Sequence, residues 1–194
     1  MAAKATELSH RARATVRAMS DRLTIFQYAY FVDDVFESAR RWAAVNGAGP
    51  FFVTEHHEAD RFTYRGTDVE ADVTYAFGYS GDAQIQLIAQ HDDSPSIYRD
   101  MFAPGEFGFH HVAKYPADYD GERQRLIDAG FELACELHAN DIVAGYFDTR
   151  DAIGCFTELH SRSDRIANTF ARWHQAHLDW DGMGDPIRTH VSGT

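Results

Sequence analysis

Cysteine is scarce in this chain of 194 residues: Cys135 and Cys155 are its only two, and they do not form a CxxC pair. This scarcity argues against a disulfide scaffold. It predicts a reducing compartment, which we take to be the cytoplasm.

Long apolar runs and an excess of positive charge are also missing. No apolar run approaches the length of a membrane span, so we expect no membrane association. The chain carries 18 basic and 30 acidic residues, a formal net charge of −12. Nucleic acids and anionic membranes bind clustered cations, so neither is expected as a partner. Residues 1–23 are rich in arginine and lack the apolar core of a secretory signal, which favours a solvated helical extension or arm over a transit peptide.

What the chain does contain is one order of elements, repeated. Residues 25–34 resemble a strand that runs into a loop, and residues 35–47 follow with helical spacing and a glycine at the end. Strand-like segments and a hairpin over residues 71–90 complete the first copy. The second copy begins with a strand at residues 109–118 and ends with a hairpin over residues 142–160.

This order predicts an α+β fold made of two βαβββ modules, whose curved mixed sheet surrounds a shared cavity. The modules are predicted at residues 24–92 and 108–161, joined by a linker over residues 93–107. Residues 162–194 are predicted to form a C-terminal amphipathic helix, centred on Ile166, Phe170 and Trp173, with a loose tail after Asp181.

Matching the two copies selects four polar residues inside otherwise apolar strands. Gln27 matches His111, and Gln86 matches Glu158. Each residue alone is most simply explained as a solvent-facing side chain on a half-exposed strand. Four residues at equivalent positions favour an inward orientation, in which the Glu158 carboxylate needs a cation or a donor.

A divalent metal ion would satisfy that need. One imidazole, one carboxylate and two amide oxygens suit a hard or borderline ion with six ligands better than closed tetrahedral zinc. The ligand types do not distinguish among Mn, Co, Ni, Fe, Mg and Zn. The neighbouring His110 is expected to point to the opposite face of its strand, because adjacent strand side chains alternate.

The segments QYAYFVDDVFESA, IQLIAQ, HHVAKYPADYD and FTELH resemble the vicinal oxygen chelate superfamily of glyoxalases, methylmalonyl-CoA epimerases and bleomycin-resistance proteins. The resemblance covers residues 24–161. It implies the two-module fold, a homodimer, and Gln27, Gln86, His111 and Glu158 as metal ligands. Gln27 departs from the pattern, since the family usually has a histidine there, and this departure argues against a ring-cleaving dioxygenase.

The segment VEADVTYAF resembles the epimerase segment that carries the catalytic base, which implies that Glu70 removes a proton beside a carbonyl. A surface acid in an acidic protein is the alternative for Glu70. The resulting hypothesis is a metal-dependent isomerase, epimerase or lyase, with Glu70 and Glu158 as catalytic groups. Its substrate would be a small molecule with a carbonyl or acyl group, bulky or aromatic if the many aromatic residues line the cavity. The alternative is a non-catalytic protein of the same fold that sequesters a small molecule.

Overall fold

The computed structural model describes residues 24–189, and these form a single curved mixed sheet with a few helices. Its elements in chain order are β1 (Ile25–Phe31), α2 (Val35–Asn46), β2 (Phe51–Thr54), β3 (Arg61–Tyr64), β4 (Thr67–Asp68), β5 (Val73–Ser80), β6 (Ala83–Gln90), β7 (Gly108–Lys114), α3 (Tyr119–Asp128), β8 (Leu133–Ala139), β9 (Ile142–Phe147), α4 (Arg150–Ile153), β10 (Phe156–His160), α5 (Asp164–Asp179) and β11 (Ile187–Thr189). No helix in this part of the chain is long and apolar enough to cross a membrane. The helical extension predicted for residues 1–23 lies outside the described residues.

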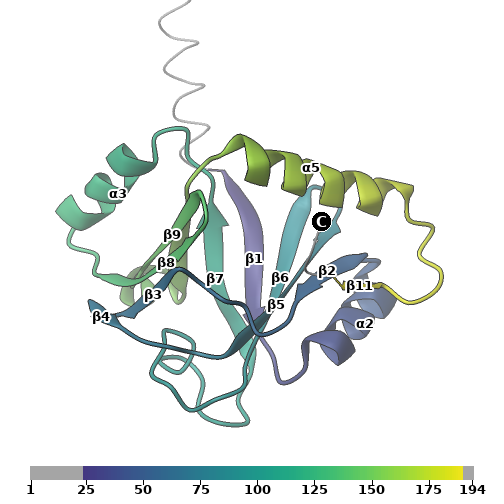
Figure 1. Ribbon diagram of the computed structural model, residues 1–194, viewed down its shortest axis with the longest axis horizontal. Coiled ribbons are helices and arrows are strands. Elements are labelled where there is room, and N and C mark those ends of the chain that lie inside the picture. The colour runs from purple at the N-terminus through teal and green to yellow at the C-terminus, as the bar shows by residue number, and fades with distance from the viewer. Residues whose placement is uncertain (1–23, 190–194) are drawn as a thin grey trace, which may run out of the picture.

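Two βαβββ units meet at the centre of the sheet, as the sequence predicts. The strands follow the order β11-β2-β5-β6-β1-β7-β10-β9-β8-β3-β4. Strands β1 and β7 pair antiparallel at the centre, while β6 runs parallel to β1 and β10 runs parallel to β7. Strands β2, β5, β6 and β1 of the first unit thus lie in one half of the sheet, and the strands of the second unit lie in the other half (Figure 1). The module boundaries at residues 24–92 and 108–161 stay a prediction.

The helices of the two units begin at matching aspartates. The Asp34 side chain accepts hydrogen bonds from the backbone N–H groups of Phe36 and Glu37, so it caps the start of α2. Asp118 caps α3 in the same way through the N–H of Gly121. Helix α2 ends at Gly47, whose φ of 61° is the left-handed conformation that glycine adopts without a steric penalty. In Figure 1, α2 lies near the end of the sheet that carries β2 and β11, α3 lies near the end that carries β8 and β9, and α5 crosses above β6 and β2.

Three parts of the chain differ from the predicted plan. Strand β3 leaves the first unit and pairs with β8 at the far edge of the sheet. Helix α4 interrupts the predicted second hairpin between β9 and β10. The tail after Asp181 was predicted to be loose, which is wrong for β11, because these residues pair in parallel with β2. A pairing made by only three residues leaves little sequence signal.

The linker between the units is packed against the core. Ile97 and Tyr98 are fully buried, and the Tyr98 ring stacks on Phe31 with ring centroids 5.8 Å apart. Tyr98 and Tyr75 also share a hydrogen bond of 3.1 Å between their hydroxyl oxygens. These contacts join the linker to both the centre of the sheet and β5.

A partly buried ion-pair network holds the loop before α4. Asp148 accepts from Arg150 at 2.7 Å and from Arg65 at 3.1 Å. The hydrogen bond from Arg150 lowers the pKa of Asp148 to about 2, against the opposing effect of burial and with a further contribution from Arg65. A lowered carboxyl pKa contributes stability that is present above the ordinary pKa near 4 and is lost as the pH falls toward 2.

We therefore expect Asp148→Asn to lower the free energy of unfolding by about 1–2 kcal/mol at pH 7. The variant should also lose less stability than the wild type between pH 4 and pH 2. Urea denaturation across this pH range measures both effects. Asp68→Asn is the control, because its pair with Arg61 is exposed and an exposed pair contributes at most about 1 kcal/mol. Equal pH dependence of wild type and Asp148→Asn would contradict this account.

Candidate functional site

Four polar side chains come together from the four central strands of the sheet. Gln86 lies on β6, Gln27 on β1, His111 on β7 and Glu158 on β10, and these strands are consecutive neighbours. The register aligns them, because Ala29 on β1 is the partner of both Gln86 and His111. All four side chains are buried, with relative exposures of 0–3%.

Each of these side chains has a buried atom without a hydrogen-bond partner among the described residues. The atoms are Gln27 Oε1, Gln86 Oε1, His111 Nε2 and Glu158 Oε2. A buried polar atom left unpaired costs free energy, so such atoms are rare unless a ligand or water completes them. Carboxylate and amide oxygens are acceptors, and the imidazole nitrogen is an acceptor whenever it carries no proton. These four acceptor atoms therefore need a hydrogen-bond donor or a cation to pair with.

The hydrogen bonds of His110 indicate the tautomer of His111. His110 Nε2 lies 3.1 Å from the carbonyl oxygen of Ile97, to which it donates. A neutral His110 then offers its Nδ1 lone pair to His111 Nδ1 at 2.8 Å, so His111 donates there. His111 Nε2 is left as a lone pair. Burial lowers the pKa of His111 to about 3, which keeps the ring neutral.

Adjacent side chains on a strand point to opposite faces, and the sequence therefore predicts that only one of these histidines enters the site. His110 and His111 are both fully buried and share a hydrogen bond, but His111 is the one beside Glu158.

The Glu158 carboxylate lies in an environment that disfavours its charge. Burial raises its pKa to about 7, while His160 and a hydrogen bond with Tyr146 act in the opposite direction. Its Oε2 lies 2.9 Å from His111 Nε2 but without hydrogen-bond geometry. A carboxylate oxygen and an imidazole lone pair repel each other at this distance unless a proton or a cation lies between them.

A second buried glutamate shows what Glu158 lacks. Glu122 on α3 is 4% exposed, yet its carboxylate contacts Arg125 at 2.7 Å and Lys114 at 3.3 Å. The hydrogen bond with Arg125 lowers its pKa despite its burial. The two side chains are equally buried, but only Glu122 has cations of the chain beside it.

The donor set fits a divalent metal ion. Gln27, Gln86, His111 and Glu158 offer three oxygen atoms and one neutral imidazole nitrogen, which are ligands of hard or borderline ions. The unpartnered atoms are the very ones that would coordinate such an ion. Other ligand positions would be left to water or to a substrate.

These residues lie beside a cavity of about 900 Å³, a volume in the range of small-molecule sites. Gln27, Gln86 and Glu158 line it from the sheet, and α5 lines it from the other side with Ile166, Phe170 and Trp173. The Trp173 ring stacks on Phe77 with ring centroids 5.3 Å apart. We call this space the main cavity.

Glu70 is not among the residues that line the main cavity. It is exposed, and it borders a second hollow of about 1100 Å³. The two hollows adjoin, because His57, Tyr75 and Leu137 line both. The structure therefore brings four of the predicted site residues together and places the fifth in the adjoining space.

Tyr146, Arg165 and Arg172 also lie at the main cavity, although the sequence analysis does not predict them as site residues. Tyr146 on β9 is the register partner of Glu158, and a search for the residue opposite Glu158 in the hairpin could have found it. Arg165 and Arg172 on α5 also line the main cavity. Their positions depend on how α5 packs, for which the sequence has no signal.

Comparisons with known proteins agree with this fold. The model of the Glyoxalase/Bleomycin resistance protein/Dioxygenase superfamily matches residues 26–146. No curated protein matches the chain.

Among solved structures, methylmalonyl-CoA epimerase from Mycobacterium tuberculosis is similar at 17% identity and a TM-score of 0.53, covering 74% of this chain and 91% of that one. A methylmalonyl-CoA epimerase variant from Streptomyces coelicolor in complex with 2-nitronate-propionyl-CoA is also similar, with 17% identity, a TM-score of 0.45, and coverage of 72% and 96%. A hypothetical protein from Bacillus halodurans has 13% identity, a TM-score of 0.49, and coverage of 73% and 95%. At 17% identity, the likeness to the epimerase from Mycobacterium tuberculosis supports the fold alone.

Proposed function

The chain belongs to the glyoxalase, bleomycin resistance protein and dioxygenase superfamily, and from this premise we propose that it is a metal-dependent isomerase, epimerase or lyase that removes a proton beside a carbonyl group. One observation carries the proposal: four buried acceptor atoms on four neighbouring strands have no hydrogen-bond partner among the described residues, and three of their side chains line a cavity. The methylmalonyl-CoA epimerases in the comparisons are consistent with an activity of this class.

Gln27, Gln86, His111 and Glu158 would hold the divalent ion. When bound, the ion supplies Lewis-acid polarisation of the substrate carbonyl, which makes the neighbouring C–H bond more acidic. His110 keeps the lone pair of His111 Nε2 available by fixing the tautomer of that ring. The buried Tyr146 hydroxyl orients the Glu158 carboxylate through their hydrogen bond.

Two carboxylates are proposed to move the proton. Epimerisation requires the proton to leave one face of the carbon and to return to the other face, so two groups must approach from different directions. Glu70 approaches from the adjoining hollow and is the proposed base, while Glu158 approaches from the sheet. The C–H bond breaks toward Glu70, which takes the proton, and the electron pair stays on the substrate. In an isomerase, a proton returns to the other face of the same carbon. In a lyase, the electron pair forms a C=C bond while the substituent on the adjacent β-carbon departs with its bonding electrons.

The lining of the main cavity suggests the kind of substrate. Phe77, Phe170 and Trp173 offer aromatic surface to a bulky acyl group. Arg172 is exposed, and its guanidinium donates a hydrogen bond to the hydroxyl of Thr169 at 3.2 Å. In an acidic protein, such a guanidinium favours a substrate with an anionic end.

Two further expectations accompany this function. The family resemblance predicts a homodimer. The two cysteines are free and buried, which is compatible with the predicted reducing, cytoplasmic compartment.

Deuterium exchange tests the proposal. We expect the metal-loaded protein to exchange the α-proton of a bulky acyl substrate in D₂O, and treatment with a chelator to stop the exchange until Mn²⁺ is restored. Mass spectrometry of a panel of acyl thioesters and free 2-substituted acids measures the exchange. Exchange at the same rate with and without a divalent ion would contradict the metal-dependent reaction.

The second candidate function is sequestration of a small molecule, which the size and aromatic lining of the main cavity favour. A sequestering protein would bind a bulky aromatic ligand tightly without metal and without proton exchange. Isothermal titration of the metal-free protein with the same panel distinguishes the two functions.

A further inference from the structure

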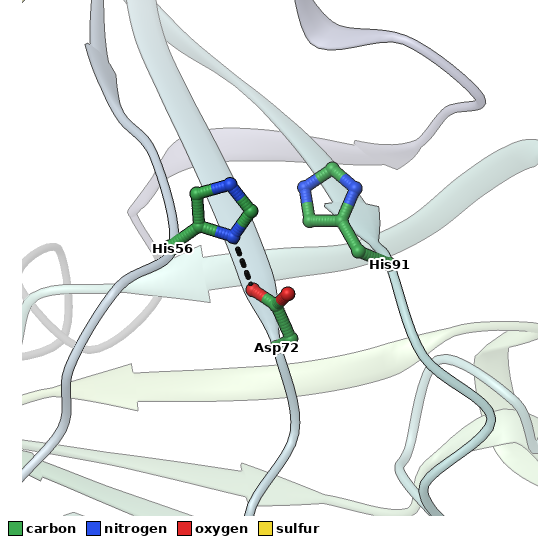
Figure 2. Close-up of side chains that lie close together, drawn as sticks. All are labelled: His56, Asp72 and His91. Carbon is green, nitrogen blue, oxygen red and sulfur yellow. Dashed lines mark hydrogen bonds and ion pairs between the residues drawn. The ribbon is translucent and has the colours of Figure 1, made fainter.

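Three side chains outside the main cavity gather at one end of β5 and β6. His56 follows β2, Asp72 precedes β5 and His91 follows β6. Figure 2 shows the two imidazole rings side by side above the Asp72 carboxylate. One ligand atom from each residue can be chosen so that all three lie within 4.8 Å of one another.

The backbone of the first unit determines this arrangement. Val73 and Gln90 are partners in the antiparallel pairing of β5 and β6, so Asp72 and His91 leave the sheet side by side. The N–H of His91 donates to the carbonyl of Asp72 at 2.8 Å. His56 has a φ of 47°, a left-handed conformation that few residues other than glycine adopt.

One buried threonine links the two histidines. Thr74 Oγ1 accepts from the backbone N–H of His56 at 3.2 Å and lies 2.8 Å from His91 Nε2. The Thr74 side chain is 2% exposed, so the surrounding residues hold its hydroxyl group in place. The Asp72 carboxylate lies 2.7 Å from His56 Nδ1, which orients that ring as well. The three groups are thus oriented before any ligand arrives.

The surroundings favour a cation. His56 and Asp72 border the second hollow, whose charged lining residues are mainly acids, including Asp92. A concave surface with this charge raises the local concentration of cations.

We propose that His56, Asp72 and His91 form a second divalent-metal site that prefers borderline transition ions such as Zn²⁺, Ni²⁺ or Cu²⁺. Two imidazoles and one carboxylate are ligands that such ions favour. Ligand atoms around such an ion stand about 3.3 Å apart, so a small rotation of exposed side chains closes the site. With three protein ligands, the ion keeps a position open toward the second hollow. The oxygen-rich set in the main cavity has the different preference of harder ions.

Zinc titration of the metal-free, full-length chain tests this site. We expect His91→Ala and Asp72→Asn each to weaken one Zn²⁺ equivalent by at least about 100-fold. His174→Ala is the matched control, because His174 lies beside the Asp82 carboxylate at 3.4 Å but belongs to no group of three close ligands among the described residues. The control should bind zinc as the wild type does.

A third variant protects the test against misfolding. His56→Asn removes the imidazole but retains a residue type that tolerates a positive φ. This variant should therefore weaken the same zinc equivalent as His91→Ala and Asp72→Asn. In the absence of metal, it should keep the circular dichroism spectrum and the urea midpoint of the wild type.

The second site is independent of the proposed function of the main cavity. In a Glu158→Gln background, one zinc equivalent should remain, and adding His91→Ala should remove it. Co²⁺ substitution gives a further readout, since visible d–d bands report on the ligands of the remaining site. Wild-type zinc affinity and stoichiometry in both His91→Ala and Asp72→Asn would overturn the proposal, whatever the main cavity binds.

Discussion

Glu158→Gln is expected to abolish metal binding in the main cavity while leaving the metal-free protein at least as stable as the wild type. Glutamine has nearly the same shape but supplies no negative charge to a divalent ion. In the metal-free fold, burial already disfavours the charge of Glu158 and raises its pKa to about 7. Replacing the carboxylate with a neutral amide removes that unfavourable charge.

Thermal unfolding with and without Mn²⁺ measures the effect. A metal ion at 100 times its Kd stabilises the folded chain by about 2.7 kcal/mol. For a chain of this length, that raises the Tm by about 5–10 °C. We expect this increase in the wild type and an increase of less than about 2 °C in Glu158→Gln, because the ion binds at least about 100-fold more weakly. Metal-dependent proton exchange should be lost with it.

Glu122→Gln is the control with the opposite pattern. Glu122 is as buried as Glu158, but Arg125 and Lys114 neutralise it. Its replacement leaves those cations without their carboxylate and should lower the free energy of unfolding by about 1–3 kcal/mol. The Mn²⁺ response should remain intact. A wild-type Mn²⁺ response in Glu158→Gln would refute the proposed ligand set.

The fold and the four central residues could be predicted because both follow from strand periodicity. Alternation determines which face a residue occupies, and matching Gln27 with His111 fixes the register between the two units. Duplication then places the matched residues Gln27 and His111 on the neighbouring strands β1 and β7, and it places Gln86 and Glu158 on the two strands that flank this pair. Matching positions between the two copies of the repeat is enough to predict which residues are equivalent, and it needs no knowledge of side-chain contacts.

The remaining features depend on contacts between segments far apart in the chain. His56 and His91 are brought together by the ends of β2 and β6, and the sequence gives no sign that these ends meet. Because His56 and His57 are adjacent in the sequence, strand alternation places them on different faces, which favours surface positions over a metal-binding pair. The packing of α5 over the main cavity is also not predictable from the sequence. An amphipathic pattern shows which face of a helix is apolar, but it does not show which surface that face packs against.

The contact between His110 and His111 is another feature that the sequence does not predict. Alternation predicts different faces for the two side chains. The register between β1 and β7 shifts at His110, however, and the His110 ring stacks on Phe156, the β10 partner of His111. Alternation does not predict such an irregularity. It says nothing about ring rotation, through which the two Nδ1 atoms approach to 2.8 Å. The tautomer of His111, and hence its ability to bind a cation, follows from that contact alone.

Glu70→Gln is expected to reduce proton exchange by about 100- to 10,000-fold without changing metal binding. This range is typical of the loss of a positioned general base. Glutamine cannot accept the substrate proton, yet it preserves the size of the side chain. Glu70 is exposed and lies outside the set of buried acceptor atoms, so neither the fold nor the Mn²⁺ response should depend on it.

Steady-state kinetics of exchange, together with Mn²⁺ titration of the same preparation, measures both quantities. Glu58→Gln is the matched control, because Glu58 is an exposed carboxylate that borders the same hollow. Loss of exchange in Glu70→Gln but not in Glu58→Gln would identify Glu70 as the base that acts across the boundary between the two hollows. Full exchange in Glu70→Gln would leave Glu158 as the carboxylate that removes the proton, because it is the one that lines the main cavity itself.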